Sequence, residues 1–319
     1  MRAVTFDQAL TFDPAHPDPA PQDGEALLRV HSAGICATDL QITRGYMNFR
    51  GVLGHEMVGT VTRGPAEWRG KRVVCEINCV CRKCDMCQRG LSGHCRQRTV
   101  MGIVGRNGCF ADFVAMPVRN LHALPDAVSD EEAVFVEPLA AAFQVLAQVP
   151  IERRMAVCVV GSGRLGNLVA QVLQTTGCKL IVVGRNERKL ELCEKRGIQT
   201  LHLRDAVPKH DQDIVVDCSG SPDGVRLALQ LVRPRGTVVL KTTAAEGGTL
   251  NLASAVVNEV NILGSRCGPF PEAINALARR AVDVRPLISR TFPIERAIEA
   301  LDAARQPENV KVLLKVSGR

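Results

Sequence analysis

The sequence predicts an α/β protein with two domains, a β-barrel-like domain followed by a domain built on a doubly wound parallel sheet. Between Val52 and Val118 the chain shows short β segments punctuated by glycines, a pattern typical of a barrel rather than of layered α/β structure. From residue 155 onward, buried-strand runs alternate with helical stretches, a pattern typical of a parallel sheet covered by helices.

The composition fits a soluble globular protein and argues against two classes of partner. The 319 residues are 46% hydrophobic but only 3% aromatic, so the cores must be built from aliphatic side chains. The net charge of +7 is spread without any block of five like charges, which argues against nucleic acid as a partner. No apolar run reaches the ~18 residues of a membrane span. The N-terminus lacks the pattern of a signal peptide, so we expect no membrane association.

The N-terminal half is predicted to consist of short strands joined by loops. A first strand near the N-terminus is followed by a surface loop, in which four prolines between residues 13 and 21 forbid a helix. Further strands are expected at Glu25–Val30, Val58–Thr62, Lys71–Cys75 and Ala111–Met116.

Two glycine-bracketed segments contain candidate metal ligands. The first, residues 34–39, reads Gly-Ile-Cys-Ala-Thr-Asp and contains Cys36; the second, residues 54–59, reads Gly-His-Glu-Met-Val-Gly and contains His55 and Glu56. Cys and His are strong ligands for a borderline-soft divalent metal, and a carboxylate can complete the set. Three protein ligands with one open position are typical of a catalytic zinc. Taken singly, Cys36 could be a buried apolar residue and His55 a turn residue.

Five of the thirteen cysteines lie between Cys79 and Cys95. Cys81, Cys84, Cys87 and Cys95 are separated by two, two and seven residues. Four thiolates in one short loop can enclose a tetrahedral ion with no open position, so we expect a structural zinc. An iron–sulfur site or oxidised pairs are the alternatives, and Cys79 could compete as a ligand. Clustered cysteines without an export signal indicate a reducing cytoplasm.

Residues 129–149 predict a capped helix, a break at Pro138 and then an Ala-rich helix. Glu137 is an acid within an otherwise apolar run. Its ordinary explanation is a helix N-terminal acid that the helix dipole favours.

A dinucleotide-binding fingerprint follows the strand Met155–Val160. Gly-Ser-Gly-Arg-Leu-Gly opens a helix, and a second strand is expected at Leu180–Val183. In this context the glycines permit a tight turn and a close backbone approach to a pyrophosphate at the helix N-terminus. The expected cofactor contacts are Gly161, Ser162, Gly163, Arg164, Leu165 and Gly166, together with Ser219 further along the chain.

The end of the second strand indicates which dinucleotide binds. In NAD-binding units an Asp or Glu stands there, roughly 20 residues after the glycine turn, and accepts hydrogen bonds from the ribose. Here the position is Gly184, followed by Arg185 and Asn186. Without a carboxylate a 2′-phosphate is not repelled, and a guanidinium can bind it. We expect NADP(H) in preference to NAD(H); alternatively, Arg185 stacks on the adenine or faces solvent, and NAD binds.

The remaining elements complete the sheet and return the chain. Strands are expected at Asp213–Asp217, Gly236–Leu240, Asn261–Leu263 and Val310–Val316, and helices near Pro271–Arg280 and at Pro293–Arg305. In the last helix Ile294, Ala297, Ile298 and Leu301 are expected to share one face.

These motifs resemble those of the zinc-dependent medium-chain alcohol dehydrogenases, over nearly the whole chain. The resemblance implies a GroES-like catalytic domain at residues 1–138 with a structural-zinc lobe at 79–95. It further implies a Rossmann domain at 139–268 and a segment at 269–319 that returns to the first domain, which would place the active site in the cleft between the two.

The resemblance also implies roles for single residues. Cys36, His55 and a carboxylate would hold the catalytic zinc; of Glu56 and Glu137, Glu137 is the stronger candidate in the resting enzyme. Thr38 would pass on the substrate proton. Asp39 would orient a ligand imidazole.

The implied function is hydride transfer between an alcohol and NADP(H). Glu56 and the Glu-Pro-Leu segment resemble the polyol, sugar and threonine dehydrogenase branches, so a secondary alcohol, polyol or sugar-like substrate is expected, in a cytoplasmic homodimer or homotetramer. The alternatives are a zinc-independent quinone or enoyl reductase, against which Cys36, His55 and Glu137 argue, and a non-enzymatic zinc module that binds nucleic acid.

Overall fold

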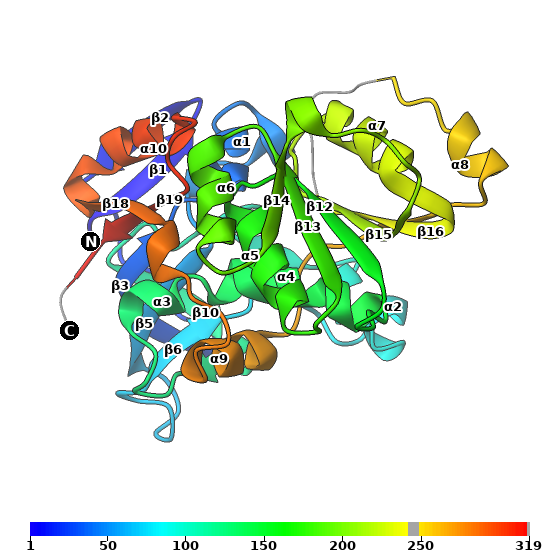
Figure 1. The fold of residues 1–319 in the computed structure, drawn as a ribbon. Coiled ribbons are helices and arrows are strands. Elements are labelled where there is room, and N and C mark those ends of the chain that lie inside the picture. Colours follow the sequence, from blue (N-terminus) through cyan, green and yellow to red (C-terminus); the bar gives the residue numbers. More distant parts are fainter. Residues whose placement is uncertain (242–248, 318–319) are drawn as a thin grey trace. The chain divides into compact units, whose positions relative to one another are not determined.

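The computed structural model describes residues 1–241 and 249–317 and divides the chain into two units (Figure 1). The first unit contains Met1–Glu137 and Ile288–Arg319, and the second contains Pro138–Leu287. The sequence had suggested a boundary at residue 269. The structure keeps residues 269–287 in the second unit, where Gln171 exchanges two hydrogen bonds with the backbone of Asp283, at 2.8 and 3.1 Å, and the return to the first unit begins at Ile288.

The first unit is built mainly from short strands. Its strands are β1 (Ala3–Asp7), β2 (Ala9–Asp13), β3 (Glu25–Gly34), β4 (Gly51–Val52), β5 (Glu56–Arg63), β6 (Arg72–Cys75), β7 (Asn78–Cys79), β8 (Thr99–Met101), β9 (Gly105–Arg106), β10 (Phe113–Pro117), β11 (Leu121–Ala123), β18 (Ile288–Pro293) and β19 (Lys311–Lys315). Its helices are α1 (Ala37–Ile42), α2 (Asp85–Gln88), α3 (Asp130–Ala133) and α10 (Ala297–Arg305).

Strand β3 is the centre of the main sheet of this unit. The sheet has the order β11-β6-β5-β3-β19-β18, with β10 also paired to β3. At the end of β3, Gly34 lies opposite Glu56 of β5 on one side and Leu313 of β19 on the other. The C-terminal strand is thereby brought beside both glycine-bracketed segments.

The second unit contains a single parallel sheet with the order β14-β13-β12-β15-β16-β17. Its strands are β12 (Ala156–Val160), β13 (Lys179–Gly184), β14 (Gln199–His202), β15 (Gln212–Asp217), β16 (Val232–Leu240) and β17 (Asn261–Gly264). Its helices are α5 (Arg164–Gln174), α6 (Glu187–Glu194), α7 (Pro222–Leu231), α8 (Ala253–Val257) and α9 (Phe270–Ala278), and α4 (Val136–Gln148) leads into it.

The strand order places the helices of this unit on both faces of the sheet. From β12 the chain moves outward through β13 to β14, and from β15 it moves the opposite way to β16. Because parallel crossovers are right-handed, α5 and α6 cover one face and α7 the other. The strands are rich in buried valines, including Val157, Val159, Val215 and Val238. The predicted doubly wound sheet with an aliphatic core is confirmed.

Three details differ from the sequence-based predictions. Strand β2 forms a hairpin with β1 through Gln8, which has a positive φ of 64°, whereas only one strand was expected before the loop that begins at Asp13. Helix α4 begins at Val136, so the break precedes Pro138; a proline in the first helical turn forfeits no intrahelical hydrogen bond. Ile298 is 43% exposed, unlike Ile294, Ala297 and Leu301, which are buried. The reason is that residues 294–296 form a 3₁₀ turn before α10, which shifts the helical phase.

None of the helices within the described residues combines the length and the apolar character needed to cross a membrane.

Candidate metal and cofactor sites

Cys36 is held at the N-terminus of α1 by the side chain of Asp39. The backbone N–H of Cys36 donates to Oδ2 of Asp39 at 2.8 Å, and Asp39 is fully buried. A carboxylate three residues into a helix that accepts the N-cap amide is half of a capping box. The same contact therefore begins α1 and fixes the backbone that bears the Cys36 thiol.

The second oxygen of Asp39 orients His55. Oδ1 of Asp39 lies 3.1 Å from Nδ1 of His55, and both side chains are buried. Because an ionised carboxylate only accepts hydrogen bonds, Nδ1 carries the proton and Nε2 keeps its lone pair for a metal. The structure thus brings Asp39 to the imidazole as expected, and the role of His55 as a metal ligand stays a prediction.

Glu56 forms a buried ion pair that the sequence did not suggest. Oε2 of Glu56 contacts Nζ of Lys311 on β19, and both side chains are at most 1% exposed. The ammonium also donates to the carbonyl of Ile35 at 3.3 Å and lies 5.6 Å from the ring centroid of Phe135. Burial lowers the pKa of Lys311 to about 8, although the negative charges of Cys36 and Asp39 act in the opposite direction.

The donor set of this first group, Cys36, His55 and Glu56, fits a divalent metal. One ligand atom of each residue lies within 4.8 Å of the others. The negative charges of Cys36, Asp39 and Glu56 exceed the single positive charge of Lys311, and a dication would balance them. The same negative charge acts on His55: burial alone would lower its pKa, but Asp39 and Cys36 outweigh burial and raise it well above its usual value. The surroundings therefore favour positive charge at the imidazole, either a proton or a metal ion on Nε2.

Of the other two predicted site residues, Thr38 lies close to this group and Glu137 is not part of it. Oγ1 of Thr38 lies 3.8 Å from Sγ of Cys36, on the half-buried first turn of α1. Glu137 is half-buried at the start of α4 and does not join Cys36, His55 and Glu56 in the described structure. The acid that the structure brings to the thiol and the imidazole is therefore Glu56.

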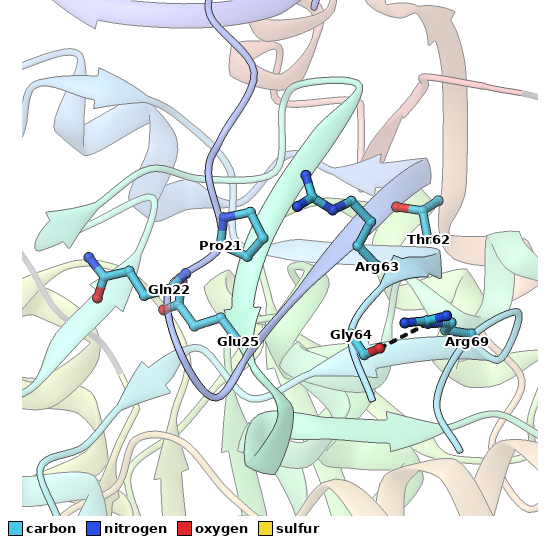
Figure 2. A pocket seen from close by; sticks show the side chains of 7 residues that line it. All are labelled: Pro21, Gln22, Glu25, Thr62, Arg63, Gly64 and Arg69. Atoms are coloured by element: carbon cyan, nitrogen blue, oxygen red, sulfur yellow. Dashed lines mark hydrogen bonds between the residues drawn. The ribbon is translucent and has the colours of Figure 1, made fainter. Parts of the chain in front are cut away.

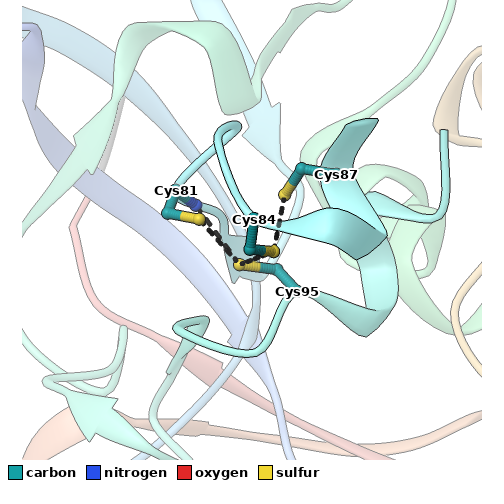
Figure 3. A group of neighbouring side chains, drawn as sticks. All are labelled: Cys81, Cys84, Cys87 and Cys95. Atoms are coloured by element: carbon teal, nitrogen blue, oxygen red, sulfur yellow. Dashed lines mark hydrogen bonds between the residues drawn. The ribbon is translucent and has the colours of Figure 1, made fainter. Parts of the chain in front are cut away.

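The four clustered cysteines form a second group in the loop between β7 and β8 (Figure 3). Their sulfur atoms face one another, with separations of 3.4 Å for Cys81–Cys95, 3.6 Å for Cys84–Cys87 and 3.8 Å for Cys84–Cys95. A tetrahedral zinc with bonds of about 2.3 Å requires sulfurs roughly 3.8 Å apart. Disulfides would require about 2.05 Å, and sulfurs this close leave no room for a multi-iron cluster. The geometry fits a single tetrahedral ion.

The backbone of this loop prepares two of the four thiols for a metal. Backbone amides of Cys87 and Arg96 lower the pKa of Cys84 to about 6, and the amide of Lys83 lowers that of Cys81. Burial and the neighbouring Cys84 raise the pKa of Cys87 to about 12. Cys79 is not in the group; it is buried nearby, 3.9 Å from Nδ2 of Asn120.

The glycine turn of the second unit has the geometry that a dinucleotide needs. Gly161 has a positive φ of 109°, and a Cβ on it would lie 2.7 Å from the carbonyl oxygen of Cys218. A Cβ on Gly166 would collide with the carbonyl of Gly161. By contrast, a Cβ on Gly163, the N-cap of α5, would meet open space. The turn is tight against β15 and open at the helix N-terminus, where a pyrophosphate would bind.

The predicted selectivity residues lie at the end of β13. Gly184 is the last residue of the strand, Arg185 is exposed, and Asn186 caps α6 by accepting the N–H of Lys189 at 3.1 Å. Ser219 lies just after β15, and its N–H donates to Oδ1 of Asp217 at 3.1 Å. The other oxygen of this buried Asp217 has no hydrogen-bond partner in the described structure, which leaves an acceptor beside the turn.

Sequence reasoning missed Lys311, Lys241 and Asn167. Lys311 and Lys241 are buried lysines on or just after apolar strands, and this mismatch was the available signal. Nζ of Lys241, directly after β16, donates to the carbonyls of Ala141 and Arg266 at 2.6 and 2.9 Å. Asn167 ties the glycine turn to α6, and nothing in the sequence distinguished it.

A cavity of about 450 Å³ lies elsewhere in the first unit (Figure 2). Its lining is Pro21, Gln22, Glu25, Thr62, Arg63, Gly64 and Arg69, and Arg69 donates to the carbonyl of Gly64 at 2.9 Å. The lining includes none of the predicted ligands or cofactor contacts.

Two family models match the chain. The alcohol dehydrogenase GroES-like domain matches residues 22–126, and the zinc-binding dehydrogenase model matches residues 165–282. The chain belongs to the zinc-dependent medium-chain alcohol dehydrogenases. The predicted fold class, a GroES-like domain with a Rossmann domain, and the predicted enzyme class are confirmed, and neither alternative function is favoured.

Similar proteins place this dehydrogenase on the polyol branch of the family. Sorbitol dehydrogenase of Gallus gallus is 27% identical over 324 residues, covering 94% of this chain and 91% of the relative. A zinc-binding dehydrogenase from Sinorhizobium meliloti 1021, bound to NADP, is 26% identical with a TM-score of 0.89 and 99% of each chain covered. A short chain alcohol dehydrogenase from E. coli CFT073, complexed with NADH, is 25% identical with a TM-score of 0.89 and the same coverage.

Proposed function

We propose that this dehydrogenase interconverts a secondary alcohol of the polyol or sugar type and the corresponding ketone, with NADP(H) as the preferred cofactor. The observation that carries the proposal is the buried group of Cys36, His55 and Glu56, oriented by Asp39 and Lys311. The relationship to sorbitol dehydrogenase supports the substrate class.

Cys36, Nε2 of His55 and a carboxylate would hold the catalytic zinc, and Cys81, Cys84, Cys87 and Cys95 the structural one. When bound, zinc supplies Lewis acidity that lowers the pKa of the substrate hydroxyl, and the nicotinamide supplies a hydride acceptor. Glu56 already stands with the thiol and the imidazole, and its second partner is Lys311. Glu137 remains our candidate for an additional or alternating ligand.

The chain's own residues would orient the ligands and move one proton. Asp39 keeps the proton of His55 on Nδ1, and the buried Lys311 holds the Glu56 carboxylate charged and in place. The Thr38 hydroxyl, 3.8 Å from the Cys36 sulfur, would accept the proton of the substrate hydroxyl while donating its own onward, because a hydroxyl is both acceptor and donor.

The preference for NADP(H) is supported by Gly184 and Arg185. The strand ends without a carboxylate, and the exposed Arg185 guanidinium follows directly. Such a group can make charge-assisted, bidentate contacts to a 2′-phosphate. Arg185→Leu should weaken binding of NADP(H) roughly tenfold and leave NAD(H) nearly unchanged.

A polyol screen tests the proposed reaction. Purified enzyme is supplied with NADP⁺ or NAD⁺ and with sorbitol, arabitol, galactitol, 2,3-butanediol or ethanol, and absorbance of the reduced cofactor is followed. Zinc-dependent turnover, lost in Cys36→Ser and greatest with a polyol and NADP⁺, is expected. Turnover that survives both chelation and Cys36→Ser would contradict the metal assignment, and an exclusive preference for ethanol would contradict the substrate class.

We further propose that the enzyme forms a homodimer or homotetramer and works in the cytoplasm. Val256 and Val257 on α8 are 76% and 80% exposed, next to the edge strand β17 with Ile262 at 41%. Exposed apolar side chains on an edge strand and on the helix before it favour association with another copy. All thirteen cysteines are free, which fits a reducing compartment. Light scattering after size exclusion measures the mass, which Val257→Asp should reduce toward the monomer.

A further inference from the structure

Gly184 has a steric reason to lack a side chain, because other atoms already occupy the space that a side chain would need. A Cβ on Gly184 would lie 2.8 Å from Cβ of Ser162, closer still to its hydroxyl oxygen, and 3.0 Å from Cδ2 of Leu190. The φ of Gly184 is not in the positive range that only glycine favours. The backbone conformation would thus allow a residue with a side chain, but the contact with Ser162 excludes one.

Ser162 has little freedom to move aside. It lies in the glycine turn, 5% exposed, directly after Gly161, whose N–H donates to the carbonyl of Val183 at 2.7 Å. The carbonyl of Ser162 accepts from Nδ2 of the buried Asn167 at 2.7 Å. Asn167 is itself fixed, because its Oδ1 accepts from the thiol of Cys193 at 3.2 Å. The turn therefore cannot relax away from β13 without breaking these bonds.

The hydroxyl of Ser162 is available to a ligand. The carbonyl of Ser162 accepts a hydrogen bond from Asn167, whereas its hydroxyl makes none within the described residues. The hydroxyl oxygen stands where the side chain of an acid at position 184 would begin. An acid there accepts hydrogen bonds from a ribose 2′-OH, whereas a serine hydroxyl can donate one to a 2′-phosphate.

The backbone that follows Gly184 is fixed as well, by His202. His202 of β14 lies opposite Gly184. Its Nε2 lies 3.0 Å from the carbonyl of Arg185, and its Nδ1 accepts the N–H of Arg204 at 3.2 Å. The imidazole thus connects the backbone of Arg185 to that of Arg204 and fixes the backbone that follows Gly184.

We propose that Ser162 and Gly184 form a specificity pair: Ser162 excludes the acid that would select NAD(H), and its hydroxyl donates to the 2′-phosphate of NADP(H). The inference rests on the proposed preference for NADP(H) and adds Ser162 as the residue that determines it jointly with Arg185. It follows that a change at position 184 alone cannot convert the cofactor preference.

The steric part is tested without cofactor, by thermal unfolding of variants. Gly184→Ala should lower Tm by several degrees, and Ser162→Gly in the same chain should restore most of the loss. Gly163→Ala is the matched control, since its Cβ would meet nothing within 4 Å in the same turn. If Gly184→Ala unfolds at the wild-type temperature, or if Ser162→Gly fails to rescue it, the steric pairing is wrong.

The binding part is tested by titrating NADPH and NADH into the zinc-loaded protein and following nicotinamide fluorescence. Ser162→Ala should raise the Kd for NADPH about tenfold, the effect of one hydrogen bond to a charged group, and leave NADH within about twofold. Gly184→Asp should weaken both cofactors, and Ser162→Gly with Gly184→Asp should bind NADH more tightly than NADPH.

The outcomes separate this inference from the proposed function. Wild-type protein that binds NADH as tightly as NADPH would refute the proposed cofactor preference itself. Wild-type protein that prefers NADPH, with Ser162→Ala losing both cofactors equally or neither, would leave that preference standing and overturn the role of Ser162. Gly184→Asp that alone converts the preference would likewise overturn the pairing.

Discussion

The two ligand groups of the first unit use the same thiol chemistry in opposite surroundings. Cys81, Cys84, Cys87 and Cys95 lie within one short loop, and three of them are partly exposed. In the other group Cys36 is half-buried at the N-cap of α1, and His55 and Glu56 are buried where β5 begins. The group of four cysteines has no position left for a substrate, whereas the group of Cys36, His55 and Glu56 has three candidate ligands.

The difference lies in what holds the ligands before a metal arrives. In the cysteine loop the sulfurs contact one another and backbone amides, so the metal itself must order the loop. Around Cys36 the ligands are held by Asp39 and Lys311, through α1 and β19. A site that must bind substrate repeatedly is thus supported by the fold, while the closed site supports the fold.

The largest expected effect is the loss of activity in Cys36→Ser. Removing a catalytic-zinc ligand should lower kcat/KM roughly a thousandfold or more, with Tm close to that of the wild type because Asp39 still caps α1. Steady-state kinetics and thermal unfolding are measured on the same preparation. A variant that loses its fold along with its activity would contradict the proposal that the fold holds this group without the metal.

Cys84→Ser should show the reverse pattern. Its loop depends on the metal for order, so we expect Tm to fall by roughly 5–10 °C and the yield of folded protein to drop. Cys79→Ala is the matched control, because Cys79 lies beside the loop but outside the group. An unchanged Tm in Cys84→Ser, or the same loss in Cys79→Ala, would show that the loop does not depend on its four thiolates.

Lys311→Met tests whether the fold itself holds the Glu56 carboxylate in place. It leaves the Glu56 carboxylate buried without its partner, which should lower the free energy of unfolding by about 3–5 kcal/mol. Urea denaturation measures the change, and Lys315→Met, at the exposed end of the same strand, is the control. Adding Glu56→Gln should recover part of the loss. Equal stability of the two lysine variants would mean that the buried pair contributes nothing.

Asp39→Asn should have the smallest of these effects. The amide cannot hold both the Cys36 amide and the Nδ1 proton of His55 as a carboxylate does. We expect zinc affinity at this group to fall about 10–100-fold, measured by competition with a chromogenic chelator. Affinity within twofold of the wild type would show that the fold orients His55 without Asp39.

Much of this contrast could be predicted from sequence because most ligands are local. The cysteine loop is contiguous, and the two glycine-bracketed segments follow each other closely along the chain. Lys311 could not be predicted, because it reaches Glu56 only through the pairing of β19 with β3. Gly184 was correctly located at the end of its strand, but the reason for its lack of a side chain is Ser162, a contact between two strand ends.

The errors in the elements have the same physical origin. The break before α4 was placed at Pro138 because proline usually ends helices, yet in a first turn it does not. Ile298 was assigned to the buried face because the periodicity was counted from Ile294 as one regular helix, whereas a 3₁₀ turn precedes α10. Local patterns specify the type of an element better than its phase.

The most direct test of the two-group account is the zinc content per chain, by elemental analysis of freshly purified, unchelated protein. Wild type should contain about two zinc ions. Cys36→Ser should retain the zinc of the cysteine loop and about one ion in total. The folded fraction of Cys84→Ser should retain the zinc of the Cys36 group. A wild-type content of one zinc or less, or a complete loss of zinc in Cys36→Ser, would contradict the account.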